Sequence, residues 1–294
     1  MNALLICFLI SFLSWPDLLK APSPSKPKAT WIWDTSLIGT GTGRDEVLQF
    51  VRNHQVQRIF LYVNRDISRD AYRTFIQSAA RYGIEIHALD GAPDWALPAN
   101  RKPIADLIRW VKSYNASVQA GERFAGIQVD IEPYLLPEWT SEQSKIVDHW
   151  LESLLYFHNE AKKDSTLTTG AAIPFWLDSI QLSGRNVSLA EALIRELDET
   201  ALMSYRDQGR HVVHLAKNEL DWADQHGKNV WIGVEMNPSP DTPFITFYKK
   251  SRAYVDSELA LIDDLVKRHP SYAGIVVHDY TGWYNHRHRI PVDP

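Results

Sequence analysis

The sequence has 294 residues and a single cysteine, Cys7, which lies in the apolar run at the start of the chain. Disulfides, cysteine metal sites and a thiol nucleophile are therefore excluded for the rest of the chain. Lysine and arginine form no long run, and the formal net charge is -5. This balance argues against binding to nucleic acid or an anionic membrane, so a neutral substrate fits better.

Several motifs that bind cofactors are also missing. The chain has no glycine-rich phosphate loop, no Gly-x-Ser-x-Gly elbow and no dinucleotide fingerprint. Metal-dependent barrel hydrolases usually carry His-x-His on the first strand, where this chain has Trp31-Ile32-Trp33. A His-Arg-His sequence does occur at His286 to His288, but it follows the last expected strand, so we expect a surface tail there. We therefore predict no catalytic metal and no cofactor.

The N-terminal apolar run, MNALLICFLISFLSW, is too short to cross a bilayer but suits a signal peptide. No Lys or Arg precedes the run, which leaves an uncleaved N-terminal anchor as the alternative. We expect residues 1–20 to be this segment, 21–28 to be a linker, and 29–294 to form one catalytic domain. The mature chain is then a monomer with no stable membrane span, secreted or held in the periplasm or cell envelope.

After the linker, short apolar or β-branched runs alternate with amphipathic stretches of helical period. This alternation is typical of parallel strands joined by helical crossovers. The expected strands are Trp31–Trp33, Arg58–Val63, Glu85–Leu89, Phe124–Ile131, Leu167–Ile173, Ala201–Tyr205, Val230–Val234 and Ala273–His278. Eight such units in a chain of this length favour a single-domain α/β fold, the (β/α)8 TIM barrel, over an open doubly wound sheet.

Capping residues support the helices between these strands. Ser68 is placed to cap a helix that ends at Gly83, and Thr140 with Gln143 could form a capping box. Gly227 and Pro270 are placed to end two later helices.

The fourth expected strand carries the chemistry, because catalytic residues of this fold follow the strand ends. Side chains alternate along a strand, so Gln128, Asp130 and Glu132 face the same side, towards the barrel interior. Two neighbouring carboxyl groups do not both ionise freely, and one of them keeps its proton to higher pH. We expect Glu132, nearest the rim, to be the proton donor. The alternative is that Asp130 and Glu132 are structural partners of Arg or Lys in the barrel core.

The segment from Phe124 to Tyr134 resembles the fourth-strand signature of glycoside hydrolase family 18, the chitinase-like family, which reads Asp-Gly-x-Asp-x-Asp-x-Glu. This chain supplies Gly126, Asp130 and Glu132, but it has Ala125 and Gln128 in place of the first two aspartates.

A second segment, ALMSYRD from Ala201 to Asp207, is similar to the Met-x-Tyr-Asp stretch on strand six of the same family. Met203 and Tyr205 are in register, and Arg206 replaces the aspartate. The tryptophan that the family usually has on strand eight would fall near His278.

The resemblance implies that Glu132 protonates the glycosidic oxygen while Asp130 orients the 2-acetamido group of the substrate. Tyr205 would hydrogen-bond the same group, whose carbonyl oxygen attacks the anomeric carbon. Such retaining, substrate-assisted hydrolysis needs no nucleophile from the enzyme. The implied substrate is a polysaccharide or oligosaccharide that contains N-acetylhexosamine.

Further residues near strand ends could contact the sugar, because aromatic rings stack on sugar faces and polar groups bind hydroxyls. Trp139 and Trp283 belong to the aromatic candidates at strand ends. The expected substrate-binding residues are Gln128, Trp33, Asp90, Trp95, Trp176, Arg206, Asp207, Glu235, His278 and Asp279.

Other functions remain open from the sequence. Glu235 ends the seventh expected strand and could be the nucleophile of a covalent retaining glycosidase with Glu132 as its acid. A chitinase-like lectin would keep the barrel without catalysis, and a hydrolase of another polymer linkage, such as an amide, could use the same carboxylates.

Overall fold

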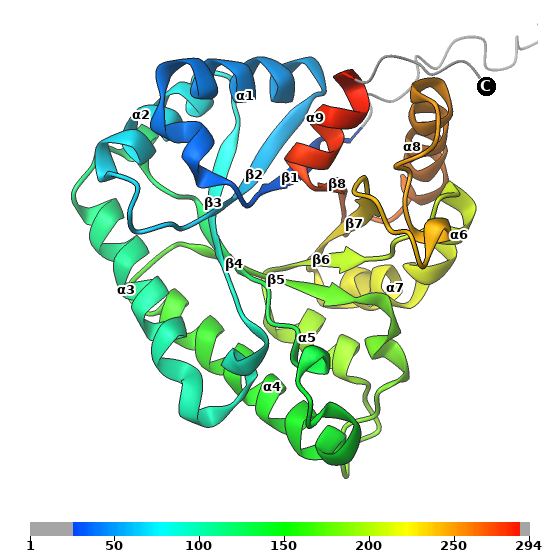
Figure 1. Cartoon of the computed structure of the whole chain (residues 1–294). Coiled ribbons are helices and arrows are strands. Elements are labelled where there is room, and N and C mark those ends of the chain that lie inside the picture. The colour runs from blue at the N-terminus through cyan, green and yellow to red at the C-terminus, as the bar shows by residue number, and fades with distance from the viewer. Residues whose placement is uncertain (1–25, 289–294) are drawn as a thin grey trace, which may run out of the picture.

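Eight parallel strands close into a barrel in which each strand pairs with the next along the chain and β8 pairs with β1. The computed structural model describes residues 26–288, and Figure 1 shows the strands at the centre with the helices around them. The predicted (β/α)8 barrel is confirmed, and the closed strand order rules out the open doubly wound sheet.

The strands are β1 (Lys28–Ile32), β2 (Val56–Tyr62), β3 (Glu85–Asp90), β4 (Gly126–Val129), β5 (Thr168–Pro174), β6 (Glu199–Met203), β7 (Asn229–Glu235) and β8 (Tyr272–His278). The helices are α1 (Gly41–Asn53), α2 (Arg69–Ala80), α3 (Arg101–Ala116), α4 (Trp139–Lys162), α5 (Leu189–Glu196), α6 (Gly209–Leu215), α7 (Lys217–His226), α8 (Arg252–Val266) and α9 (Tyr280–His288).

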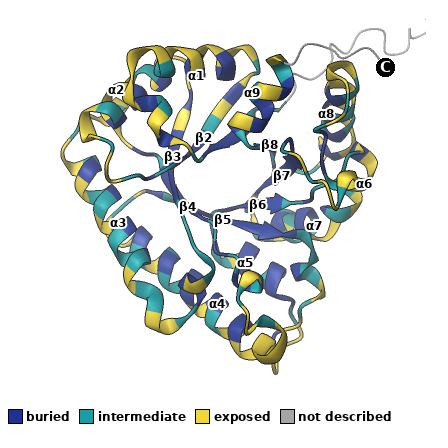
Figure 2. Cartoon of the chain, in the orientation of Figure 1, coloured by how far each residue is buried: buried dark blue, intermediate teal, exposed yellow. Residues whose placement is uncertain are grey.

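Alternate strand residues fill two separate apolar regions. One set packs inside the barrel, and the other packs between the strands and the helices, whose outer faces are exposed (Figure 2). The interior set comprises Ala29, Trp31, Phe60, Leu89, Ala172, Ala201, Trp231 and Val276. These apolar side chains fill the middle of the barrel. The inward-facing positions at its two ends therefore remain for polar side chains.

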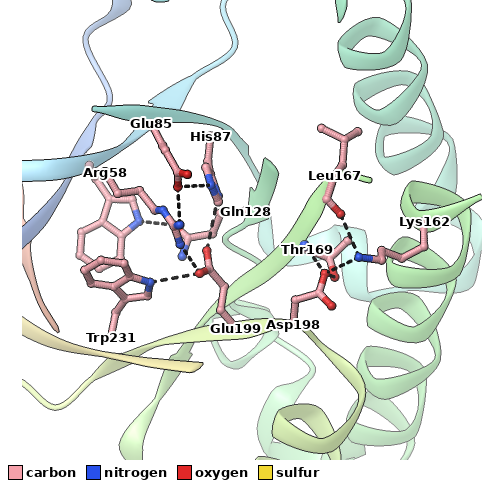
Figure 3. Close-up of polar contacts among 11 residues, drawn as sticks. Arg58, Glu85, His87, Gln128, Lys162, Leu167, Thr169, Asp198, Glu199 and Trp231 are labelled. Atoms are coloured by element: carbon pink, nitrogen blue, oxygen red, sulfur yellow. Dashed lines mark hydrogen bonds and ion pairs between the residues drawn. The ribbon is translucent and has the colours of Figure 1, made fainter. Parts of the chain in front are cut away.

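The inward positions at the N-terminal end of the barrel hold a buried cluster of charges (Figure 3). The guanidinium of Arg58 on β2 donates to Glu199 on β6 and, at 2.5 Å, to Glu85 on β3. Trp231 donates from Nε1 to Glu199 Oε2 at 3.1 Å, and His87 Nδ1 lies 3.4 Å from Glu199 Oε1. Although burial opposes its ionised form, these contacts lower the pKa of Glu199.

A second polar contact ties α4 to the barrel wall outside this cluster (Figure 3). Lys162 donates to the Asp198 carboxylate at 2.9 Å, and the same carboxylate oxygen accepts from the backbone N–H of Thr169 at 2.9 Å. The helix is therefore anchored to the start of the neighbouring strands β5 and β6.

Some expected boundaries need correction. Lys28 belongs to β1, because its backbone pairs with β2 and β8, so the linker ends before it. Helix α4 begins at Trp139 and has a non-helical residue at Glu142, so the predicted cap at Thr140 lies inside the helix. Ser68 does cap α2, and Gly227 ends α7 with a φ of 64°, as predicted.

The expected surface tail at His286 to His288 is also wrong, because these residues end the helix α9. His286 is 3% exposed, and its Nε2 lies 2.8 Å from the carbonyl oxygen of Lys250. The predicted signal peptide or anchor at residues 1–20 lies outside the described residues.

Replacing Glu199 with glutamine should destabilise the fold strongly, because it removes the buried charged partner of Arg58 and leaves only the more exposed Glu85 to compensate the guanidinium. We expect the free energy of unfolding in urea to fall by about 3 to 5 kcal/mol. The matched control is Glu196→Gln, since Glu196 makes an exposed pair with Arg195 and should contribute less than about 1 kcal/mol. Equal effects of the two substitutions would contradict the role assigned to the buried cluster.

Candidate active site

Asp130 directly follows β4 at the C-terminal end of the barrel. Its backbone N–H donates to the carbonyl oxygen of Asp90 at 3.1 Å, so the ends of β3 and β4 stay together. Gly91 is the first residue after β3, and its backbone lies very close to that of Asp130. A Cβ atom at this position would lie 2.0 Å from the backbone oxygen of Asp130. Glycine is therefore required at this position to hold Asp130 in place.

The carboxyl group of Asp130 is poorly compensated. Its Oδ1 is inaccessible to solvent and has no hydrogen-bond partner within residues 26–288. Burial, and next the negative charge of Glu132, raise the pKa of Asp130 to about 7, against a smaller opposing effect of His278. The pair of acids thus holds one proton near neutrality, as expected for adjacent carboxyls. Because the charge of Glu132 is one cause of this shift, the two carboxyl groups titrate as a pair.

Glu132 lies nearer the rim and is half-buried. The hydroxyl of Tyr134 donates to Glu132 Oε1, and the Tyr134 ring packs edge-on against Trp176 with ring centres 5.1 Å apart. Burial, followed by the charge of Glu132, raises the pKa of Tyr134, so this hydroxyl remains a donor at every working pH. Glu132 is therefore oriented by a neutral donor that packs against an aromatic ring.

Neither acid forms an ion pair with Arg or Lys in the part of the chain that the structure describes. The partly buried guanidinium of Arg58 pairs with Glu199 and Glu85 at the other end of the barrel. The alternative in which Asp130 and Glu132 serve as structural partners of buried cations is therefore not supported.

Tyr205, two residues after the end of β6, faces the same group of side chains. Its ring centre lies 5.9 Å from that of His278, and burial together with the charges of Glu235, Asp130 and Glu132 raises its pKa well above the usual value. A Cβ at residue 233 would lie 3.1 Å from Tyr205 Cε1, so Gly233 leaves room for the ring. Tyr205 therefore presents a protonated hydroxyl beside the two acids.

Glu235 and His278 form a pair at the ends of β7 and β8. His278 Nδ1 lies 2.8 Å from Glu235 Oε2, and the backbone N–H of Asn237 donates to Glu235 Oε1 at 2.6 Å. Burial disfavours the imidazolium, but the hydrogen bond and charge of Glu235, with Asp279 and Asp130, outweigh it and raise the pKa of His278. Both carboxylate oxygens of Glu235 are thus engaged.

Asp279 supports this pair from the next position on the chain. Its Oδ1 accepts from Asn237 Nδ2 at 3.2 Å and from the backbone N–H of Gly282 at 2.8 Å. The segments that follow β7 and β8 are therefore joined by side-chain hydrogen bonds directly beside Glu235.

The other expected sugar contacts are distributed around the rim. Trp33 is half-buried, with its ring centre 6.0 Å from that of Tyr62. Asp90 accepts from the backbone N–H of Gly91 at 2.9 Å, and burial raises its pKa. Asp207 forms an ion pair with Lys250 at 2.7 Å.

Three expected contacts are corrected. Gln128 is fully buried below the rim and accepts from Trp31 Nε1 at 2.6 Å, so it cannot reach a ligand. Trp95 is 8% exposed and packs in the layer between barrel and helices. Trp283, a candidate for sugar stacking, is 0% exposed in the same layer. Each of these side chains is held inside the protein by apolar packing or by a buried hydrogen bond.

Sequence reasoning missed Tyr134 and Asn237. Tyr134 follows Glu132 and Pro133 directly, and this proximity to the expected acid was the available signal. Asn237 follows Glu235 by two residues, but its link to Asp279 joins positions far apart in the chain, which no local pattern indicates.

Within residues 26–288, no three His, Cys, Asp or Glu side chains gather closely enough to hold a metal ion. None of the helices in that range is both long and apolar enough to cross a membrane.

We expect Asp130→Asn to stabilise the folded protein at alkaline pH. The folded-state pKa is raised from 3.8 to about 7, so the folded state binds the proton more tightly and the wild type loses stability as pH rises between these values. Removing the charge should recover up to about 4 kcal/mol above the folded pKa. Thermal denaturation across pH would measure this gain, with the exposed Asp94→Asn as control. A constant difference at all pH values would contradict the raised pKa.

No family model and no curated protein sequence matches the chain. A chitinase from Bacteroides thetaiotaomicron matches in structure with a TM-score of 0.54 and 13% identity, over 88% of this chain and 90% of that one. A family 18 chitinase from Pseudoalteromonas aurantia gives a TM-score of 0.56 and 10% identity, over 87% and 94%.

The same barrel also occurs in other glycosidases. A putative alpha-L-fucosidase from Bacteroides thetaiotaomicron gives a TM-score of 0.53 and 14% identity, over 90% of this chain and 91% of that one. At such low identity these matches establish the fold. The chain therefore has the fold of glycoside hydrolase family 18 chitinases over most of its length, as the resemblance in its sequence predicts.

Proposed function

We propose that this chain is a divergent family 18 glycoside hydrolase that cleaves a glycan containing N-acetylhexosamine. The observation that carries the proposal is the pair of carboxyl groups at the C-terminal end of the barrel, where burial and the charge of Glu132 raise the pKa of Asp130 to about 7. A carboxylic acid that keeps its proton near neutrality is the group that glycosidic cleavage needs.

In this mechanism Glu132, Asp130 and Tyr205 have different roles. The carbonyl oxygen of the substrate's 2-acetamido group bonds to the anomeric carbon while the bond to the leaving oxygen breaks. The one proton that the carboxyl pair holds passes to that oxygen through Glu132. Asp130 and the neutral hydroxyl of Tyr205 hold the acetamido group. Water then attacks the anomeric carbon as the bond from that carbon to the acetamido oxygen breaks. Glu132 takes the proton of the water, and the configuration is retained.

Glu235 is less suited to act as a covalent nucleophile. One of its oxygens contacts His278 and the other accepts from the backbone of Asn237. Because these two contacts orient the carboxylate in its pair with His278, we assign Glu235 to holding His278 at the edge of the site. We also propose, from the apolar run at residues 1–20 alone, that the protein acts outside the cytoplasm.

Glu132→Gln should abolish hydrolysis while the barrel still folds. The substitution removes the transferable proton, and general acid catalysis contributes about a hundredfold to ten-thousandfold to the rate. Product analysis on N-acetylhexosamine polymers measures the loss, with exposed Glu138→Gln as the matched control. Full activity of the Glu132 variant would refute its role, and binding of glycans by the wild type without any cleavage would favour a lectin.

A thiazoline that mimics the cyclised acetamido intermediate should inhibit the wild type, because the site would be complementary to that intermediate. Glu235→Gln should retain measurable turnover, since it removes no reacting group. Trapping of a covalent sugar on Glu235, together with no inhibition by the thiazoline, would replace substrate assistance by the two-carboxylate mechanism.

The pH dependence provides a separate check. The carboxyl pair supplies its proton only below the raised pKa of Asp130, about 7, so kcat/KM should fall as pH rises through this value. Asp130→Asn should remove this alkaline limb or shift it, besides lowering the rate. An alkaline limb unchanged by this substitution would show that another group controls the decline.

A further inference from the structure

A pocket lies beside the proposed active site, between the segments that follow β6 and β7. It has a volume of about 620 Å³, which falls within the range of ligand pockets. The lining includes Asp207, Pro238, Phe244, Tyr248, Lys249 and Lys250.

Hydrogen bonds fix this pocket next to the catalytic groups. The backbone N–H of Phe247 donates to the carbonyl oxygen of Glu235 at 2.9 Å, so the segment after β7 folds back onto the strand end. The backbone N–H of Asp207 donates to the carbonyl oxygen of Phe244 at 2.9 Å, which joins the two segments. Asp207 follows Tyr205 by two residues, so one short segment contributes both to the proposed active site and to the pocket.

The pocket lining contains two lysines and one aspartate, so its formal charge is positive. Lys250 is neutralised by its ion pair with Asp207. Arg206 and Lys249, in contrast, make no ion pair with any carboxylate among residues 26–288. Lys249 lines the pocket, and Arg206 lies beside it with its guanidinium packed against the lining ring of Phe244.

Arg206 is held in a defined position. Its guanidinium carbon lies 5.1 Å from the ring centre of Phe175 and 5.5 Å from that of Phe244, and Nη1 donates to the carbonyl oxygen of Tyr205 at 2.7 Å. These contacts lower the cost of ordering the long side chain and leave other N–H donors for a ligand. A planar guanidinium with free donors suits a carboxylate.

Phe244 supplies the second half of a sugar site. Its ring is 54% exposed, one of few large apolar side chains in the described residues with such exposure. An exposed ring at the edge of a pocket can stack on the apolar face of a sugar, beside a cation that binds its substituent.

We propose that this pocket binds a sugar unit that carries a carboxylate, in the same glycan whose N-acetylhexosamine unit occupies the site of Glu132. The assignment rests on the proposed function for the position of the neighbouring unit. The substrate class is an acidic glycan in which N-acetylhexosamine alternates with a uronic acid or with a sugar bearing a lactyl ether. The overall charge of the chain does not oppose this binding, because salt screens charges beyond about 8 Å under physiological conditions.

The test measures binding separately from cleavage. Glu132→Gln protein is titrated calorimetrically with oligosaccharides of N-acetylglucosamine alternating with glucuronic acid, or with the lactyl ether sugar, and with the carboxyl-amidated form of each. We expect at least one acidic form to bind about fivefold to tenfold more tightly than its amide, with an advantage that shrinks in high salt.

Adding Arg206→Gln should reduce this preference to less than about twofold, whereas Arg206→Lys should keep part of it because the charge remains. The matched control is Arg210→Gln, an exposed arginine at the start of α6 that, unlike Arg206, does not pack against Phe175 or Phe244. Equal affinity for the acidic and amidated forms of both glycans, or a preference that survives Arg206→Gln, would overturn the inference.

The outcomes separate this inference from the proposed function. A wild type that cleaves neither acidic glycan nor neutral N-acetylglucosamine oligomers, while the preference in binding persists, would refute the hydrolase and leave the acidic subsite in place. A wild type that cleaves neutral N-acetylglucosamine oligomers without any preference for carboxylate would support the hydrolase and refute the subsite.

Discussion

The chemistry proposed for this barrel depends on one carboxyl group, that of Asp130, which is buried at the C-terminal end without a compensating partner among the described residues. At the opposite end, the barrel interior pairs its charges, because Arg58 donates to two glutamates and the indole of Trp231 donates to one of them. Asp130 has no such partner for its buried Oδ1. The same fold thus keeps one acid ionised, Glu199, and raises the pKa of the other, Asp130.

This difference has an energetic meaning. An unpaired buried acid lowers the stability of the folded protein at neutral and alkaline pH, so a barrel selected for stability alone would replace it. The surrounding residues nevertheless fix it, because Gly91 allows the close approach of β3 and the Asp90 carbonyl binds the Asp130 backbone. Positioning a destabilising group so firmly is typical of a site whose chemistry requires it.

The fold and the direction of the acids could be predicted because both follow from periodicity. Alternation along one strand was enough to place Asp130 and Glu132 at the barrel mouth, and Gly227 ends its helix as its conformational freedom suggests. Periodicity could not predict which side chains are buried by residues from other strands and helices. Gln128 is bound by Trp31 of another strand, and Trp95 is enclosed by packing that no local pattern specifies.

The protonation of the two acids also depends on residues that are brought together only by the tertiary structure. Which of two acids keeps its proton depends on depth and neighbours, such as the Tyr134 hydroxyl on Glu132 and the charge of His278 near Asp130. The Glu235 pair with His278 likewise joins two strand ends that lie far apart in the sequence. These features became visible only with the coordinates of the barrel.

The most direct measurement of the central claim is a titration of the Asp130 carboxyl carbon by NMR, in the wild type and in Glu132→Gln. The account predicts a midpoint at about 7 in the wild type and a lower midpoint once the neighbouring charge is removed. A midpoint at the ordinary value of 3.8 in the wild type would contradict it.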